Sequence, residues 1–198
     1  MMLFKNYKKI TNFFVNLVSP LFSFIFLILL MPLILVVSIL IFILDGNPII
    51  FRSKRVGLLG KEFTLYKFRT MVNSNQEDNA RITKLGRFLR RSSIDEIPQL
   101  FNILKGDMLF VGPRPMPRDL LLDVKYKRYF MRRASVKPGL TGLAQIYSRG
   151  LPRSLSKKLI YDLLYIKKKS ILFDLVIIIY TFKALRKRFL VNKLGISL

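Results

Sequence analysis

Two adjacent carboxylates, Asp95 and Glu96, are the residues of this sequence best suited to chemistry. They follow a Ser-Ser pair and precede a mixed apolar run that ends at Gly106, which predicts a helix beginning near Asp95 and closed by a left-handed glycine. The chain has 11 acidic residues against 35 basic ones, and it has no His and no Cys. A Ser-His-Asp hydrolase, a thiol protease and a typical zinc enzyme are therefore excluded. Because His and Cys are absent, any chemistry of this chain must use carboxylate groups.

The carboxylate pair has a structural and a chemical interpretation. Ser93-x-x-Glu96 has the form of a capping box, which would make Glu96 a helix cap. That interpretation leaves Asp95 unexplained. Nearby cations would lower the pKa of Asp95 and keep it ionised, as a nucleophile or metal ligand requires. These cations are Arg87, Arg90 and Arg91. A carboxylate pair at a helix N-terminus can also hold Mg²⁺ and face a phosphate that the helix dipole attracts.

Two further segments carry candidate phosphate ligands. Lys67 and Arg69 stand two residues apart in a predicted strand, so they share one face and could grip a diphosphate. A solvated strand face is the alternative. In Gly112-Pro113-Arg114-Pro115, the prolines stiffen the backbone that carries the Arg114 guanidinium, which favours bidentate phosphate recognition. A rigid turn without a ligand is the alternative there.

The elements that position these residues begin with a long apolar segment. No charged residue occurs between Lys9 and Asp45, and residues 13–44 are mostly Phe, Leu, Ile and Val, which exceeds the roughly 20 residues that span a bilayer. The run is too long for a cleaved signal peptide and has no small-residue cleavage site after it. Lysines precede it, and most of the +24 net charge follows it. The positive-inside tendency thus draws both flanks to the cytoplasm.

A proline inside this segment offers a way to satisfy both flanks. Pro32 removes a backbone hydrogen bond and kinks a helix, so we expect a re-entrant helix-break-helix over residues 1–45 that returns to the cytoplasmic face near Asp45. Pro20 offers a second possible bend. An ordinary spanning anchor that tolerates its proline is the alternative.

Residues 46–198 are predicted to form one catalytic domain, with no internal repeat. The expected fold class is α/β and mostly helical, with small strand elements and amphipathic interfacial helices. The segments are strands 48–56 and 63–68 joined by a turn at 57–61, a loop at 73–80, a basic helix at 81–91, an extended stretch at 111–117, a helix at 120–133, a turn at 137–142, and two helices within 155–190. The apolar part of the last helix, residues 171–185, is short for a span, so it is expected to pack on the membrane surface or against the body.

Taken together, these motifs resemble the bacterial sugar transferase family, the monotopic phosphoglycosyl transferases that start glycan assembly on a polyprenyl phosphate. The resemblance covers nearly the whole chain. It rests on the proline-broken segment and on residues 51–57, 66–71, 95–115, 137–145, 162–165 and 174–175. The run from Asp95 to Pro115 is highly specific. The chain would be a small member without a large N-terminal extension.

The resemblance implies a two-step reaction. Asp95 would attack the β-phosphate of a UDP-sugar and release UMP, and undecaprenyl phosphate would then take the phosphosugar from the enzyme. Glu96, with Asp95, would bind the required Mg²⁺. The substrate-binding residues would be Lys67, Arg69, Arg90, Pro113 and Arg114, and Arg149 would help hold the nucleotide.

The family resemblance also implies a location, the cytoplasmic face of the bacterial inner membrane, with its lipid as a partner. No nucleic-acid reading motif is present. The alternative function is a catalytically inactive, basic membrane-surface module or assembly partner. The chain departs from the family at Met31, where some members have Ser, at Leu143, where Trp is common, and in the loop 147–150. The loop departure limits substrate inference to the class.

Overall fold

The structure is a computed structural model that describes residues 2–72, 80–118, 127–147 and 155–193. It is mostly helical with two small sheets, as the expected α/β class requires. The helices are α1 (Met2–Leu29), α2 (Met31–Asp45), α3 (Lys84–Ser92), α4 (Leu100–Leu104), α5 (Lys127–Arg133), α6 (Leu143–Tyr147), α7 (Leu155–Lys168) and α8 (Ile171–Lys193), with short 3₁₀ helices η1 (Leu58–Gly60) and η2 (Ile94–Gln99). The strands are β1 (Ile50–Val56), β2 (Glu62–Phe68), β3 (Leu109–Val111), β4 (Met116–Pro117) and β5 (Gly139–Thr141).

The apolar N-terminal segment forms the bent helix pair α1 and α2. The two helices meet at Leu30 with a bend of 62°. Pro32 lies in the first turn of α2 and has no N–H to donate to the preceding turn, which explains the break. The predicted break at Pro32 is confirmed, whereas α1 continues through Pro20. Among the described residues, no single helix has the length and apolarity to cross a bilayer, although the bent pair together has both.

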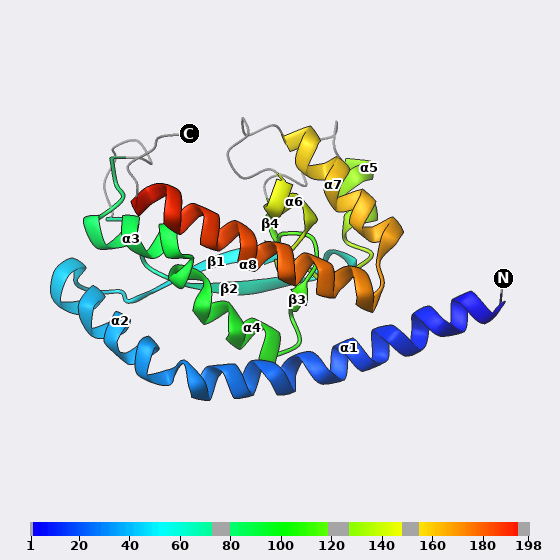
Figure 1. Cartoon of the computed structure of the whole chain (residues 1–198), viewed down its shortest axis with the longest axis horizontal. Coiled ribbons are helices and arrows are strands. Elements are labelled where there is room, and N and C mark those ends of the chain that lie inside the picture. The colour runs from blue at the N-terminus through cyan, green and yellow to red at the C-terminus, as the bar shows by residue number, and fades with distance from the viewer. Residues whose placement is uncertain (1, 73–79, 119–126, 148–154, 194–198) are drawn as a thin grey trace.

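The body of the protein packs inside the bend (Figure 1). Ser19, Ser23 and Leu27 recur every four residues along α1 and are buried, and the Ser23 hydroxyl donates to the Leu100 carbonyl over 2.6 Å. Val37 and Ile41 are buried on α2. The other faces of both helices leave large apolar side chains exposed. They include Leu21, Phe22, Ile25, Leu29, Leu35, Ile39 and Ile43.

Strands β1 and β2 form the predicted antiparallel hairpin, with Arg52 opposite Tyr66. Strand β4 pairs with the far side of β1, so β2 is an edge strand of this sheet. Asn102 of α4 closes that edge: its Oδ1 accepts from the Tyr66 N–H over 3.1 Å, and its Nδ2 donates to the Thr64 carbonyl over 2.7 Å. This fully buried amide fixes α4, and the η2 segment before it, against β2.

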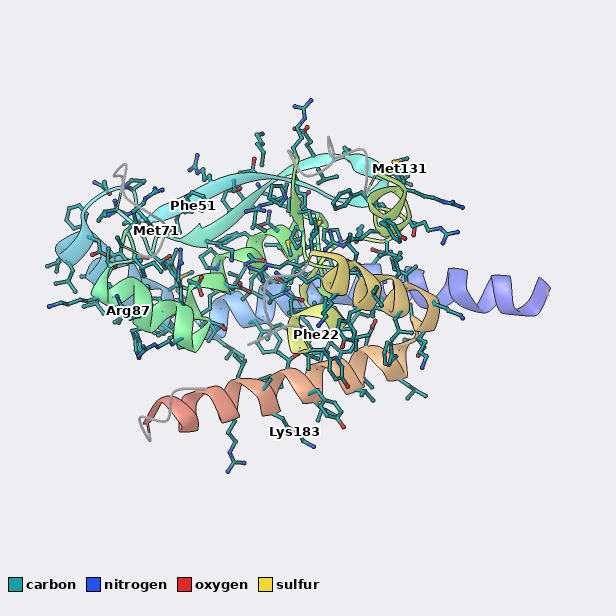
Figure 2. The ribbon with its side chains drawn as sticks, turned by 90° about the horizontal axis from the view of Figure 1, so that it is seen from above. Phe22, Phe51, Met71, Arg87, Met131 and Lys183 are labelled. Carbon is teal, nitrogen blue, oxygen red and sulfur yellow. The ribbon has the colours of Figure 1, made fainter. Side chains whose placement is uncertain are left out.

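A second sheet joins the middle of the chain to its C-terminal helices. Strand β5 runs parallel to β3, so the predicted turn at 137–142 is wrong for residues 139–141. A Cβ at Gly139 would lie 2.0 Å from the Gly112 nitrogen, which is why the two backbones need glycine where they meet. Val111, Leu143, Tyr165 and Ile177 form the core between these strands and the helices. Figure 2 shows Phe51 of the hairpin on one side of the molecule and Lys183 of α8 on the opposite side.

The other predicted elements agree with the structure where it describes them. Helix α3 is the predicted basic helix, and its N-cap Thr83 accepts from the Gly86 N–H over 2.8 Å. Helices α7 and α8 are the two predicted in the C-terminal region, and Gly106 has the expected positive φ of 78°. Most of the predicted loop 73–80 and the first part of the predicted helix 120–133 lie outside the described residues.

Candidate active site

The carboxylate pair stands at the start of a 3₁₀ turn rather than of an α-helix. Ser93 adopts a left-handed conformation, φ 60°, and η2 begins directly after it with Asp95 and Glu96 in its first turn. The Ser93 side chain makes no capping hydrogen bond, so the capping-box interpretation of Glu96 is wrong. A non-glycine residue in this conformation costs on the order of 1 kcal/mol, and such strain concentrates at functional sites.

Glu96 is fixed between two cations. Its Oε1 accepts from Lys67 Nζ over 2.9 Å and from Arg114 Nη2 over 2.9 Å, and 17% of its side chain is exposed. Burial alone would raise the pKa of Glu96, but the charges on Arg114 and Lys67 and their hydrogen bonds outweigh it and bring the pKa to about 2. Glu96 is therefore ionised at any working pH.

Asp95 is buried but unbonded. Only 8% of the residue is exposed, and within the described part of the chain its carboxylate has no hydrogen bond or ion pair. Burial raises the pKa of Asp95 and the charge of Glu96 adds to it, while Lys67, Arg114 and Arg90 act in the opposite direction. The expected lowering of this pKa is thus wrong, because burial outweighs the cations. A carboxylate with a raised pKa is a better nucleophile once it is ionised.

The structure gathers most of the predicted phosphate ligands around the pair. Lys67 and Arg114 contact Glu96 directly, and Arg90, whose charge reaches Asp95, donates from Nε to Thr70 Oγ1 over 2.8 Å. Pro113 and Arg114 both line a cavity of about 30 Å³. Arg149 lies outside the described residues.

Arg69 lies elsewhere. Strand β2 ends at Phe68, and the Arg69 guanidinium donates to the carbonyl oxygens of Asp45, Gly46 and Asn47. The last carbonyls of a helix lack backbone partners and carry partial negative charge, so they attract a cation. Arg69 therefore ties the end of α2 to the sheet, and the predicted grip of Lys67 and Arg69 on one diphosphate does not match this arrangement.

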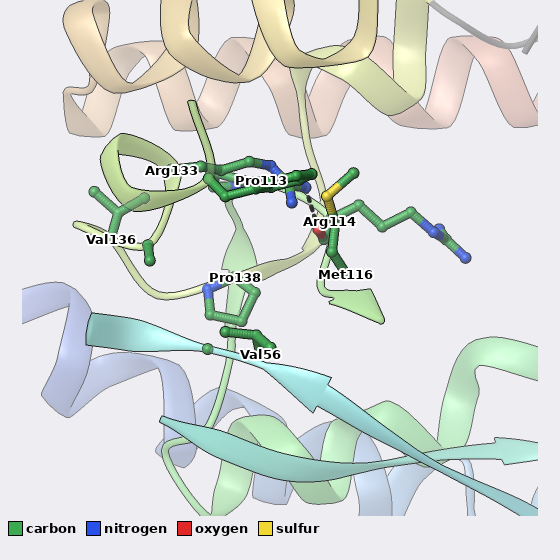
Figure 3. Close-up of a pocket in the computed structure, with 10 residues that line it drawn as sticks. Val56, Pro113, Arg114, Met116, Arg133, Val136 and Pro138 are labelled. Carbon is green, nitrogen blue, oxygen red and sulfur yellow. Dashed lines mark hydrogen bonds between the residues drawn. The ribbon is translucent and has the colours of Figure 1, made fainter. Parts of the chain in front are cut away.

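A buried ion pair supports the backbone of Arg114. Arg133 Nε lies 2.5 Å from Asp162 Oδ2, with 8% and 2% of the two side chains exposed. Arg133 also donates to the Arg114 carbonyl oxygen, the bond drawn as a dashed line in Figure 3, where Arg133 and Pro113 lie above Val56 and Pro138. This role of Arg133, which lies at the end of the predicted helix 120–133, does not follow from the sequence pattern. Asp162 was indicated only as part of residues 162–165, one of the segments on which the family resemblance rests.

These residues form a strongly cationic site around the unbonded carboxylate of Asp95. Burial lowers the pKa of Arg55, and the nearby charge of Arg114 lowers it further. Fixed cations can bind a diphosphate and stabilise the charge that moves during phosphoryl transfer. No group of three or more acidic, His or Cys ligands occurs among the described residues. Two adjacent carboxylates still fit Mg²⁺, which commonly uses one or two carboxylates together with substrate phosphates.

The carboxylate of Asp174, which is not one of the site residues above, makes the stability of the fold depend on pH. Tyr165 donates to Asp174 Oδ1 over 2.8 Å, and burial raises the pKa of Asp174 to about 6, although Tyr165 and Lys169 lower it. The folded state therefore binds a proton that the unfolded chain has lost, and this contribution to stability disappears as pH rises through about 6. We expect Asp174→Asn to remove this loss, measured by denaturant unfolding between pH 4 and 7. Tyr165→Phe should move the midpoint of this loss of stability above pH 6, because Tyr165 lowers the pKa of Asp174. If both variants kept the wild-type dependence of stability on pH, Asp174 would not be its cause.

Known proteins are similar to this chain over most of its length. The sequence model of the family described as bacterial sugar transferase matches residues 10–188. The uncharacterized sugar transferase EpsL of Bacillus subtilis (strain 168) is 46% identical over 142 residues, 69% of each chain. The UDP-glucose:undecaprenyl-phosphate glucose-1-phosphate transferase of Klebsiella pneumoniae is 41% identical over 174 residues, which are 80% of this chain and 37% of that protein.

A third relative, the undecaprenyl-phosphate galactose phosphotransferase of Salmonella typhimurium (strain LT2), is 39% identical over 171 residues, 73% of this chain and 34% of that protein. The chain thus spans about two thirds of the Bacillus protein and about one third of the other two. Because the family model matches most of its length, this chain belongs to the bacterial sugar transferase family.

Proposed function

We propose that this protein transfers a sugar 1-phosphate from a UDP-sugar to undecaprenyl phosphate and releases UMP. The observation that carries the proposal is the unbonded, buried carboxylate of Asp95 beside a Glu96 that two cations fix. The names of two relatives support the class, since they describe sugar phosphate transfer involving undecaprenyl phosphate. The rival function, an inactive basic membrane-surface or assembly module, needs charge but no such arrangement.

In the first step, a carboxylate oxygen of Asp95 attacks the β-phosphorus of the UDP-sugar. The bond from that phosphorus to the oxygen bridging the α-phosphate breaks, and UMP leaves with the electron pair. Lys67, Arg90 and Arg114 surround the reacting carboxylate with positive charge, which would stabilise the phosphoryl oxygens as this charge moves. The product is a phosphosugar bound to Asp95 as an acyl phosphate.

In the second step, a phosphate oxygen of undecaprenyl phosphate attacks the same phosphorus. The bond to Asp95 breaks, and the carboxylate is restored together with a polyprenyl diphosphate sugar. Asp95 and Glu96 would hold Mg²⁺, which supplies neutralising charge at the transferring phosphoryl group. The low pKa of Glu96, about 2, keeps it ready as a ligand throughout the cycle.

The bent helix pair supports a place for this reaction at the cytoplasmic face of the bacterial inner membrane. Its outer faces expose large apolar side chains, which suits hydrocarbon and not water. The 62° bend lets both ends of the pair return to one side of the bilayer, as a re-entrant hairpin does. The +24 net charge would attract anionic headgroups at that surface.

The test is UMP release by the full chain, purified in detergent or nanodiscs, from a panel of UDP-sugars with Mg²⁺ and undecaprenyl phosphate. We expect release that requires the lipid acceptor for multiple turnovers, and the active sugar would identify the donor. Glu62→Gln is a suitable control, because this acid lies far along β2 in an exposed ion pair with Arg118 and should leave the rate unchanged. A folded protein that releases no nucleotide from any UDP-sugar or other nucleotide donor would favour the inactive module.

A further inference from the structure

A second cavity lies outside the active site, between α2, the β1–β2 hairpin and α4. Its volume is about 320 Å³. Ile34, Phe68 and Phe101 supply an apolar wall, and Arg52, Tyr66 and Lys105 supply polar groups. Asp95, Glu96, Lys67 and Arg114 do not line it. Because side chains alternate along a strand, Tyr66 and Phe68 point to the face of β2 opposite Lys67, which faces Glu96.

The polar groups of the cavity have hydrogen-bond donors available for an anion. Lys105 Nζ donates to the Tyr66 hydroxyl oxygen over 3.2 Å, so the Tyr66 proton is left to donate to a further group. The Arg52 guanidinium is exposed and makes no hydrogen bond or ion pair within the described part of the chain. Among the residues that the structure describes, no acidic one lines the cavity. Three donors, two of them charged, match the oxygens of a phosphate group.

The rest of the cavity suits hydrocarbon. The cavity is open to the surface and Phe101 on its apolar wall is exposed, so covering that wall with hydrocarbon would remove apolar surface from water. Ile34 belongs to α2, so the cavity borders the helix pair α1 and α2, whose other faces expose apolar side chains. An occupant that joins a phosphate to a hydrocarbon chain fits both parts of the cavity. A membrane lipid has that chemistry.

We propose that this cavity binds one anionic phospholipid of the bilayer, with its phosphate at Arg52, Lys105 and Tyr66 and the start of one acyl chain along Ile34, Phe68 and Phe101. The proposal rests on the membrane placement given above. It does not assign the acceptor lipid to this cavity, because a phosphate on this face of β2 is separated by the strand from Asp95. The bound lipid would brace α2 against the sheet.

The test is native mass spectrometry of the full chain with dioleoyl phosphatidylglycerol. We expect the wild type to retain one molecule at least about 10-fold more tightly than the zwitterionic phosphatidylethanolamine, and the double variant Arg52→Gln, Lys105→Gln to lose that preference. The control is Lys54→Gln, Lys61→Gln, which removes the same charge from exposed positions of the same hairpin outside the cavity and should bind like the wild type. Equal binding by the two double variants would overturn the proposal.

Two competition experiments distinguish a phospholipid site from a site for the acceptor lipid or for free phosphate. Undecaprenyl phosphate that displaces the phospholipid from the cavity would make it an acceptor site, and displacement by equimolar inorganic phosphate would make it a site for free phosphate. Either result overturns the phospholipid assignment. Asp95→Asn should bind the phospholipid like the wild type even though it cannot react. Failure of lipid binding is therefore distinguishable from failure of the proposed reaction, which UMP release reports in the same samples.

Discussion

Asp95→Asn should lower the rate of UMP release at least about 10³-fold, because an amide cannot form the acyl phosphate on which both steps depend. The change keeps the shape of the side chain and removes its charge. The clearest measurement is intact mass: with a UDP-sugar and Mg²⁺ but no acceptor, the wild type should gain the mass of one phosphosugar, and the variant should gain none.

The pH dependence of the same reaction follows from the buried position of Asp95. Its pKa is raised, so the single-turnover rate should fall as pH drops through that pKa, at a higher pH than for an exposed aspartate. Glu62→Gln should form the adduct at the wild-type rate. If the Asp95→Asn variant still gained the phosphosugar, another residue would be the nucleophile.

Asp162→Asn should cost about 3–5 kcal/mol of unfolding free energy, because it leaves the buried charge of Arg133 without its counterion. The exposed pair of Arg118 and Glu62 provides a matched comparison. Its atoms lie 3.0 Å apart with 66% and 39% of the side chains exposed, so Glu62→Gln should cost less than about 1 kcal/mol. Denaturant unfolding in the same detergent measures both, and equal losses would contradict the role given to burial.

An apolar replacement of the buried pair separates stability from function. Arg133→Met with Asp162→Leu leaves no unpaired charge, so it should recover most of the stability that Asp162→Asn loses. It also removes the hydrogen bond to the Arg114 carbonyl. We therefore expect a stable double variant with a raised KM for the UDP-sugar. A KM equal to that of the wild type would show that Arg133 only holds the fold together.

The sequence predicted those parts of the fold that depend on local pattern. The hairpin follows from alternation around a glycine-containing turn, and the break between α1 and α2 follows from the missing N–H of Pro32. The short parallel pairing of β3 with β5 was missed. It joins segments about 30 residues apart, and three-residue strands carry too little pattern to distinguish a strand from a turn.

The clustering of the candidate site residues was predictable, whereas their electrostatics were not. The run around Asp95 and the family resemblance predicted the dyad, Lys67 and Arg114, and the structure brings these four residues together. The direction of the Asp95 pKa was missed, because neighbours in sequence are a poor guide to burial. Arg69 was misplaced since the carbonyls at the end of α2 are competing partners that no strand pattern reveals. The pair of Arg133 and Asp162 joins α5 to α7, and only the folded chain brings them together.

The amide of Asn102 has a consequence for contacts between copies of this protein. An unpaired strand edge invites pairing with a strand of another chain. Asn102 occupies the Tyr66 N–H and the Thr64 carbonyl, the two backbone groups that such a strand would need first. One buried side chain therefore blocks these two backbone groups, so the middle of β2 cannot pair through them with a strand of a neighbouring copy.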